Sequence, residues 1–334
     1  MLALKELLQI MDAIAGPPPP AAALATLVKV EGSSYRRPGA RLLVTADGRR
    51  VGSISGGCLE DDVADHARAV LADGKARVVS YDTTTENDLV WGVGLGCHGV
   101  VHLLVEPVPA APAWAAALRD HFRRRAVTEL AVVWQESAQG RLGTCLAGEL
   151  PPAVAAGAFR QVIHPPTALL VLGAGDDARP LVRMAAELGW QVTVADPRPA
   201  WATRARFPDA ADVIVLRPED APGRLAVDAD TLAVVMTHHY RHDVPLLRAL
   251  LPLPLAYLGL LGPRLRAERI LGDLAATGFA ITPEMRARLH APVGLDLGAE
   301  APEEVALAIL AEMTAVRAAR DARPLRDRTQ PIHG

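Results

Sequence analysis

The sequence predicts an α/β protein in which an N-terminal mixed α/β domain precedes a Rossmann-like domain with a parallel sheet. After residue 167, short apolar runs alternate with helical patterns, which is typical of the β-α-β units that build a parallel sheet. The turn Gly173-Ala174-Gly175 separates the first of these runs from the first helix, as in dinucleotide-binding folds. Before residue 150, Asp47-Gly48 between two apolar runs predicts a hairpin.

The chain has 334 residues, which is enough for two domains with separate cores. We expect the first domain at residues 1–150 and the Rossmann-like domain at residues 167–320. Residues 151–166 are rich in proline and therefore predict a linker. The polar, proline-containing segment 321–334 predicts a loose tail.

The first domain is expected to begin with an amphipathic helix, because apolar residues from Leu2 to Ile14 recur at helical spacing. This pattern, with charges between the apolar residues, does not resemble a signal peptide. The other expected helices are 59–71 and 114–125, and the expected strands are 23–30, 41–45, 51–55, 77–81, 100–106, 130–135 and 141–147.

The second domain is expected to contain short buried strands with helices between them. The strands are 168–172, 191–195, 213–216, 232–236 and 255–258, and the helices are 176–188, 244–251, 264–271 and 303–320. Pro302 and the acids Glu303-Glu304 mark the start of the last helix.

Composition excludes several function classes. The net charge is −3, and no cluster of Lys and Arg is large enough to indicate nucleic acid or an anionic membrane as partner. No apolar stretch reaches the roughly 20 residues that span a bilayer. Three cysteines, Cys58, Cys97 and Cys145, are a low and odd count that suits a reducing compartment, so we expect a cytoplasmic protein. The high apolar content favours a homodimer.

The turn Gly56-Gly57-Cys58 lies between an apolar run and a helix that starts with acids. Glycines allow a tight turn and a close approach of the backbone to a ligand. A cysteine at the first turn of a helix meets unpaired N–H groups and the positive end of the helix dipole, which favour a thiolate. We therefore expect Cys58 to act as a reagent or a ligand.

A second glycine-rich loop, Gly92–Gly99, contains Cys97 and His98. Ordering so many glycines is costly, which favours a loop built around a ligand. We expect Cys97 to act together with Cys58, and the alternative is a turn with a buried thiol. The spacing of the cysteines does not match a structural zinc site.

The loop 32–41, GSSYRRPGAR, combines small hydroxyl residues with Arg36, Arg37 and Arg41. Guanidinium groups bind phosphate or carboxylate through paired hydrogen bonds, and Ser-rich turns offer backbone N–H groups to anions. The loop therefore predicts an anion site, and the alternative is a solvated loop with salt bridges.

The second domain carries a dinucleotide fingerprint. Gly173 and Gly175 follow a strand and open a helix, and Asp196 ends the next strand, where an acid binds a ribose diol. Arg198 can instead meet a phosphate, and Asp176-Asp177 place negative charge where a pyrophosphate would lie. The alternative is a Rossmann domain that has kept this turn without using NAD.

The segment 237–243, THHYRHD, follows the strand 232–236 at the end where parallel sheets bind ligands. We expect His238 and Asp243 to contact the cofactor. The alternatives are helix capping by Thr237 or Asp243, and a metal-dependent hydrolase site that uses His238, His242 and Asp243.

Taken together, these pieces resemble the XdhC/CoxI family of xanthine dehydrogenase accessory factors. The matching stretches are GSSYRRPGARLLVTADG, GSISGGCLE, GVGLGCHG, LGAGDDARPL, VADPRP, VVMTHHYRHD, YLGLLGPR and APVGLDLGAEAPEEVALAILAEM, in the family's order. The resemblance covers about residues 32–313. Tyr35 stands where the family usually has proline, and His98 where glycine is common.

The resemblance implies an accessory protein that binds molybdenum cofactor, as molybdopterin or its dinucleotide form, and assists its sulfuration. It also implies delivery to a molybdenum hydroxylase such as xanthine dehydrogenase, with a cysteine desulfurase as a further partner. On this hypothesis Cys58 and Cys97 contact the molybdenum or its sulfido ligand, and the loop arginines hold the phosphate. We expect the cofactor to bind between the two domains.

The rival hypothesis is an NAD(P)-dependent oxidoreductase that uses the fingerprint of the second domain. Asp196 favours NAD over NADP. A hydride-transfer pair such as Tyr-x-x-x-Lys is not evident in a chain with four tyrosines.

Overall fold

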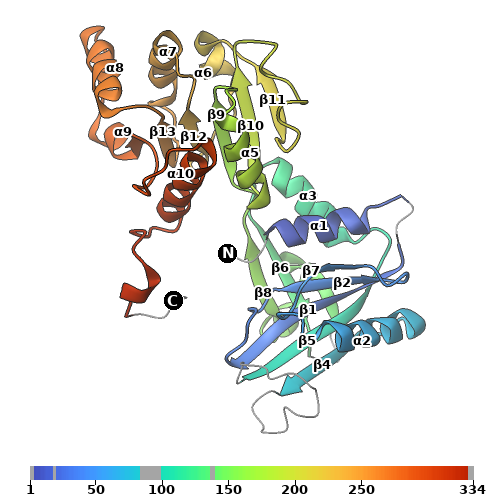
Figure 1. Ribbon diagram of the computed structural model, residues 1–334. Helices are drawn as coiled ribbons and strands as arrows, with labels where there is room; N and C mark the ends of the chain where they lie inside the picture. Colours follow the sequence, from blue (N-terminus) through green and yellow to red (C-terminus); the bar gives the residue numbers. More distant parts are fainter. Residues whose placement is uncertain (1–3, 18–19, 83–98, 136–139, 330–334) are drawn as a thin grey trace. The chain divides into compact units, whose positions relative to one another are not determined.

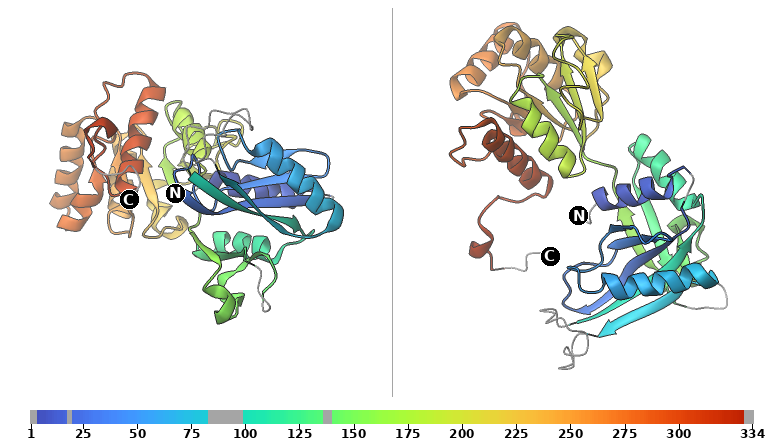
Figure 2. Two further views of the ribbon diagram at one scale, coloured as in Figure 1. Left: turned by 90° about the horizontal axis from the view of Figure 1, so that it is seen from below. Right: turned by 45° about the vertical axis from the view of Figure 1, so that its right-hand side comes forward.

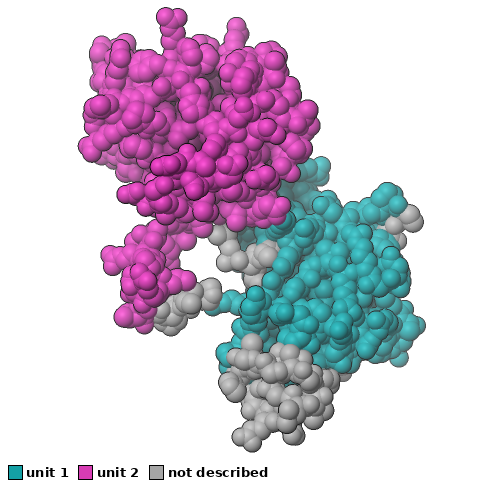
Figure 3. Space-filling model, in the orientation of Figure 1, with its two compact units in different colours: residues 1–166 teal, residues 167–334 magenta. Residues whose placement is uncertain are grey.

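The computed structural model describes residues 4–17, 20–82, 99–135 and 140–329 (Figure 1). The chain divides into two compact units, unit 1 at residues 1–166 and unit 2 at residues 167–334 (Figure 3). Both halves of the expected fold class are confirmed, since unit 1 has antiparallel sheets and unit 2 has a parallel sheet of Rossmann type.

Unit 1 is built on two antiparallel sheets. Its strands are β1 (Ala22–Gly32), β2 (Arg41–Thr45), β3 (Arg50–Gly52), β4 (Arg77–Asp82), β5 (Gly99–Val108), β6 (Thr128–Val133), β7 (Gly143–Leu146) and β8 (Phe159–Ile163). Its helices are α1 (Leu4–Ile14), α2 (Glu60–Asp73), α3 (Ala113–Arg123) and α4 (Pro152–Ala155), with a 3-10 turn η2 (Ala147–Glu149). The strand orders are β3-β2-β1-β5-β4 and β7-β6-β8.

The five-stranded sheet of unit 1 buries both faces. Helix α2 covers one face of this sheet (Figure 2). Alternate residues of β1 and β2, such as Ala25 and Leu42, pack against it. The other residues, such as Leu24 and Leu43, pack against α1, α3 and the smaller sheet. The period of two along a strand explains this division. It also explains why all five residues of β2 are buried.

Unit 2 is a doubly wound domain. Its strands are β9 (Ala168–Leu172), β10 (Gln191–Asp196), β11 (Asp212–Val215), β12 (Leu232–Val235), β13 (Tyr257–Leu260) and β14 (Leu289–His290), in the order β11-β10-β9-β12-β13-β14. Its helices are α5 (Ala178–Glu187), α6 (Ala221–Arg224), α7 (Tyr240–Leu250), α8 (Arg264–Ala276), α9 (Pro283–Arg288) and α10 (Pro302–Arg317), with 3-10 turns η3 (Pro218–Asp220) and η4 (Leu325–Asp327).

The parallel sheet of unit 2 has a hydrophobic layer on each face. Leu169 and Val171 of β9 pack in the layer of α5 and α10, whereas Leu170 and Leu172 pack in the layer of α6, α7 and α8. The strand order reverses between β9 and β12, which are neighbours in the sheet. In open α/β sheets this switch point is where ligands bind, at the carboxyl ends of the strands.

Some boundaries differ from those expected. Residues 151–166 contain α4 and β8, and β8 pairs with β6, so the expected linker is part of unit 1. Strand β3 ends at Gly52 instead of residue 55, because the N–H groups of Ile54 and Ser55 are bound by the Glu60 carboxylate. Helix α7 begins at Tyr240, earlier than residue 244, and β14 has no counterpart among the expected strands.

Candidate functional site

The turn that carries Cys58 is held by a hydrogen-bond network of its own. The Ser55 hydroxyl donates to the Glu60 carboxylate and accepts from the backbone N–H groups of Gly57 and Leu59, both at 3.2 Å. Glu60 Oε1 also accepts from the Ser53 hydroxyl at 2.9 Å. Gly57 has φ +110°, a conformation that favours glycine. The turn is therefore organised before any ligand arrives.

The charge of Glu60 is stabilised within this network. Burial raises the pKa of the carboxyl, but hydrogen bonds from the Ser55 hydroxyl and N–H and from the Ser53 hydroxyl outweigh burial and hold the pKa below its ordinary value. Glu60 is also the first residue of α2. A carboxylate at this end of a helix is favoured by the helix dipole.

Cys58 lies two residues before the first residue of α2, as the sequence predicts, and its side chain is partly exposed. Leu59 caps the helix, and its side chain makes no capping hydrogen bond. The thiol thus lies at the N-terminus of a helix of 14 residues.

The loop 32–41 lies against this turn. A Cβ placed on Gly56 would be 3.7 Å from Cδ1 of the Tyr35 ring, so the ring lies beside that glycine, and both Gly56 and Tyr35 are exposed. At the first residue of β5, a Cβ on Gly99 would be 2.5 Å from the Ser33 carbonyl oxygen. Three glycine-containing segments therefore meet at one end of the five-stranded sheet.

The three arginines of the loop do not form one cluster. Arg36 makes a two-point ion pair with Glu6 of α1. Arg41 points into the interior, where it donates to Gln161 Oε1 at 2.7 Å and to the Gly39 carbonyl at 2.9 Å. Arg37 is exposed at the surface. Of the three, Arg37 is the one whose side chain is most open to a ligand in solution.

Arg41 belongs to a buried polar group between the two sheets of unit 1. Its Nε and Nη2 atoms have no hydrogen-bond partner within the described part of the chain. Burial lowers the pKa of Arg41 to about 10, against the opposing charge of Glu106. Burial likewise raises the pKa of Glu106, although the Thr144 hydroxyl and N–H donate to it. These side chains join the sheets and do not face a surface ligand.

The other cysteines have different positions. Cys97 and His98 lie outside the described residues. Cys145 lies on β7, and its Sγ is 3.8 Å from the Ala131 carbonyl oxygen of the neighbouring strand. Burial raises the pKa of the Cys145 thiol, as do the nearby charges of Glu149 and Glu106. Cys145 thus lies on a strand near two carboxylates, and not at a helix N-terminus.

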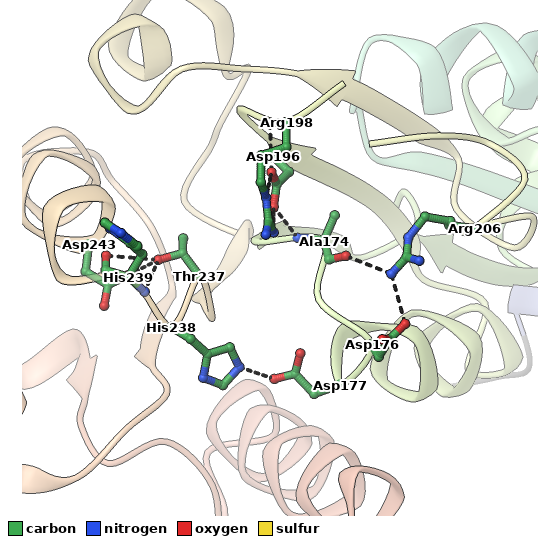
Figure 4. A network of polar contacts seen from close by, with 10 residues as sticks. All are labelled: Ala174, Asp176, Asp177, Asp196, Arg198, Arg206, Thr237, His238, His239 and Asp243. Atoms are coloured by element: carbon green, nitrogen blue, oxygen red, sulfur yellow. Dashed lines mark hydrogen bonds and ion pairs between the residues drawn. The ribbon is translucent and has the colours of Figure 1, made fainter. Parts of the chain in front are cut away.

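In unit 2 the fingerprint turn follows β9 as expected (Figure 4). Gly173 has φ +124°, and a Cβ on it would be 2.5 Å from the Met236 carbonyl oxygen at the end of β12. A Cβ on Gly175 would overlap Oδ1 of Asp177. Gly173 is therefore required by backbone contacts within the protein, whereas a side chain at position 175 would have to displace the Asp177 carboxylate.

Asp196 is fully engaged at the end of β10. Its carboxylate accepts the Ala174 N–H at 2.8 Å, the Arg198 N–H at 2.9 Å, and Nε and Nη2 of Arg198, each at 2.8 Å (Figure 4). Burial raises the pKa of Asp196, but these hydrogen bonds outweigh burial and hold it below the ordinary value. The sequence places Asp196 and Arg198 together correctly, and the structure pairs them with each other.

The acids at the start of α5 are also paired. His238 Nε2 lies 2.6 Å from Asp177 Oδ2, and Arg206 Nη2 lies 2.9 Å from Asp176 Oδ1 (Figure 4). The Arg198 and Arg206 guanidinium carbons lie 4.3 and 4.5 Å from the ring centroid of Trp201. The sequence did not predict these contacts of Asp177, Arg206 and Trp201. The contacts join loops that are far apart in the sequence, and local spacing gives no sign of them.

Asp243 has an internal role. Its buried carboxylate accepts from the Thr237 hydroxyl and from Nε and Nη2 of Arg266 on α8. The ring of His242 packs against that of His239 at a tilt of 30°, with ring centroids 4.6 Å apart. Across residues 4–17, 20–82, 99–135 and 140–329, no three His, Cys, Asp or Glu side chains are grouped so that they could hold a metal ion. In the same ranges, no helix has the length and apolarity that a membrane span requires.

Comparisons with known families match both units. Residues 20–82 match the model described as the XdhC and CoxI family, and residues 169–313 match the model described as the XdhC Rossmann domain. A relative from Bacillus subtilis (strain 168), named as a probable subunit of xanthine dehydrogenase, is 34% identical over 322 residues, which cover 89% of this chain and 93% of the relative. The molybdenum cofactor insertion chaperone PaoD from Escherichia coli (strain K12) is 26% identical over 296 residues, covering 89% and 83%.

A solved structure is similar over the whole chain. It is a crystal structure described as a xanthine dehydrogenase from Bacillus halodurans, with a TM-score of 0.78 and 30% sequence identity. The match covers 97% of this chain and 99% of that one.

Proposed function

Since this chain belongs to the XdhC and CoxI family, we propose that it binds molybdenum cofactor and inserts it into an enzyme of the xanthine dehydrogenase type. The family resemblance expected from the sequence is confirmed. The names of two relatives support this proposal. One is named as a probable subunit of xanthine dehydrogenase, and the other as a molybdenum cofactor insertion chaperone.

The observation that carries the proposal is the organised cysteine turn of unit 1. Cys58 is partly exposed at the start of α2, in a turn fixed by Ser55 and Glu60. Soft thiolate sulfur is a ligand suited to a soft or redox-active metal centre. We infer that Cys58 contacts the molybdenum or its sulfido ligand, with Gly56 and Gly57 keeping the approach open.

The phosphate of the cofactor requires a cation nearby, and Arg37 is the best candidate in the loop 32–41. Arg36 can contribute only by giving up its ion pair with Glu6, and Arg41 only by leaving the interior. Cys97 remains a proposed second thiol. Assistance in sulfuration, with a cysteine desulfurase as sulfur donor, is a finer proposal that rests on these thiols.

The decisive experiment compares cysteine variants. Wild type, Cys58→Ala, Cys97→Ala and the double variant are purified from cells that make the cofactor, and bound molybdenum is measured by elemental analysis. Transfer to a cofactor-free xanthine dehydrogenase is then measured by its activity. Cys145→Ala is the matched control, because it removes a thiol of the same unit that faces the Ala131 carbonyl.

We expect Cys58→Ala to weaken cofactor binding at least about tenfold, equal to about 1.4 kcal/mol, and Cys145→Ala to leave it unchanged. Undiminished binding and transfer by the double variant would refute the thiol role. Wild type that neither retains cofactor nor restores the client enzyme would refute the whole proposal.

The mass of the protein in solution tests the expected homodimer.

The oxidoreductase hypothesis gains no comparable support. Asp196, which would bind the ribose diol of NAD, is occupied by Arg198 and the Ala174 N–H. His238 and Asp243, expected to contact a ligand, are bonded to Asp177 and to Arg266.

A further inference from the structure

A dinucleotide needs three features at a Rossmann turn. The second glycine must leave space for the pyrophosphate, the N-terminus of the following helix must offer positive potential, and the acid at the end of the next strand must be free for a ribose diol. The backbone of unit 2 has the turn, the helix and the acid. Each of the three features is nevertheless used by a side chain of the protein itself.

The space beside Gly175 is filled by Asp177. A Cβ on Gly175 would overlap Oδ1 of Asp177, so the carboxylate lies against the backbone that a pyrophosphate would approach. A negative charge therefore occupies the place of the ligand's anion. Two anions this close repel strongly in a partly desolvated site.

His238 holds Asp177 in that position. Its Nε2 lies 2.6 Å from Asp177 Oδ2, and its own backbone adopts φ +57°. Left-handed backbone is costly for residues other than glycine, so the surrounding structure must stabilise it. The pair thus links the two strands that flank the switch point.

The ribose position is closed by Arg198. Both oxygens of Asp196 accept hydrogen bonds from Arg198, and only 1% of the Asp196 side chain is exposed. A ribose diol would have to displace a two-point ion pair. Such paired hydrogen bonds are among the stronger side-chain contacts in proteins. The Ala174 N–H is also taken by Asp196.

We propose that Asp177 and Arg198 are specificity-determining residues that exclude NAD-type dinucleotides from the Rossmann turn of unit 2. The turn serves the packing of β9 against β12, and its anion site is filled from within. This inference goes beyond the proposed function, because it concerns which ligands unit 2 rejects, and it holds independently of cofactor delivery.

The test measures binding of ADP-ribose and NAD to the full chain by isothermal titration calorimetry. The variants are Asp177→Asn, which removes the charge and keeps the shape, Asp177→Ala, which also clears the space, and Asp177→Ala with Arg198→Ala. Glu187→Ala is the matched control, because it removes one acid at the last residue of the same helix, roughly 15 Å away.

We expect no ADP-ribose binding at millimolar concentration by wild type or Glu187→Ala. Asp177→Ala should bind at least about tenfold tighter than wild type, and the double variant tighter again, because the Asp196 carboxylate then keeps only its hydrogen bonds from the backbone N–H groups of residues 174 and 198. Circular dichroism checks that each variant is folded. If Asp177→Ala does not fold, Asp177→Asn replaces it in the binding measurement.

Binding of ADP-ribose or NAD by wild type, with the affinity unchanged in both Asp177 variants, would overturn the inference. Absence of any gain in folded Asp177 and double variants would overturn it as well. A wild type that delivers cofactor while also binding NAD would refute this inference alone. A wild type that rejects NAD but neither binds nor delivers cofactor would refute the proposed function alone.

Discussion

Ser55 is the residue on which the geometry of the cysteine turn depends. Its hydroxyl is donor to Glu60 and acceptor from the N–H groups of Gly57 and Leu59, so one side chain connects the end of β3 to the start of α2. Cys58 lies between the two backbone groups that Ser55 binds. The position of the thiol is thus set by a polar network and not by core packing.

The two glycines of this turn should respond differently to substitution. Gly57 has φ +110° with no atom near a new Cβ, so Gly57→Ala strains the backbone alone, by about 1–2 kcal/mol. Gly56→Ala meets the Tyr35 ring at an ordinary contact distance and should change stability by less than about 0.5 kcal/mol. Urea unfolding of both variants measures this difference. Equal losses would contradict the role given to the left-handed conformation.

Glu60 should make the stability of unit 1 depend on pH. Its folded pKa lies below its ordinary value of 4.5, so the carboxylate stabilises the fold above that value and loses this contribution as the pH falls through the folded pKa. Glu60→Gln should therefore cost about 1–3 kcal/mol near pH 7 and less in acid.

Urea unfolding at about pH 7 and about pH 4 compares wild type with Glu60→Gln. Asp65→Asn is the control on the same helix, since Asp65 makes only an exposed ion pair with Arg68. A difference between wild type and Glu60→Gln that stays constant over this pH range would exclude the ionisation of Glu60 as its cause.

At the scale of elements, the apolar period of the strands was sufficient to predict most of the fold. β2 and β9 begin and end at the predicted residues, because β9 is a continuous apolar run and β2 has an apolar centre followed by the turn Asp47-Gly48. β8 was missed because prolines surround it and only alternate residues are buried. β14 is too short, at two residues, for any period to appear.

The candidate site was less predictable than the fold. The position of Cys58 follows from local spacing, which a sequence displays directly. Arg41 was expected beside Arg36 and Arg37, but β2 turns its side chain toward Gln161 of β8, a strand that had not been predicted. The sequence shows Arg198 only as a neighbour of Asp196 along the chain. Spacing alone does not show whether this arginine pairs with Asp196 or binds a phosphate.

Glycines in two elements of unit 2 should have opposite effects when replaced by alanine. Gly173→Ala places a Cβ 2.5 Å from the Met236 carbonyl oxygen at φ +124°, which should cost at least about 2 kcal/mol. Gly272 lies within α8 with open space around it, so Gly272→Ala should stabilise unit 2 by about 1 kcal/mol. Thermal unfolding distinguishes them, and a stable Gly173→Ala variant would show that β12 can move aside.

At the scale of the whole molecule, each unit contains its own hydrophobic clusters. The clusters around β9 to β13 contain only residues of unit 2, and those around α1, α2 and β1 only residues of unit 1. A domain that folds independently needs a hydrophobic core made of its own residues, and each unit has one.

Residues 167–334 expressed alone should therefore fold and unfold in one cooperative transition. The measurement is calorimetry, in which the calorimetric and van't Hoff enthalpies should agree for the fragment. The fragment 1–166 provides the complementary test. An aggregated or non-cooperative fragment 167–334 would show that its core is incomplete without the preceding residues.

The glycines of the fingerprint turn have a consequence for the evolution of such chains. Gly173 is required by its positive φ and by the Met236 carbonyl, so selection for folding alone would keep this residue across generations. Descendants of an ancestral nucleotide-binding domain can therefore lose the ligand and still display its motif.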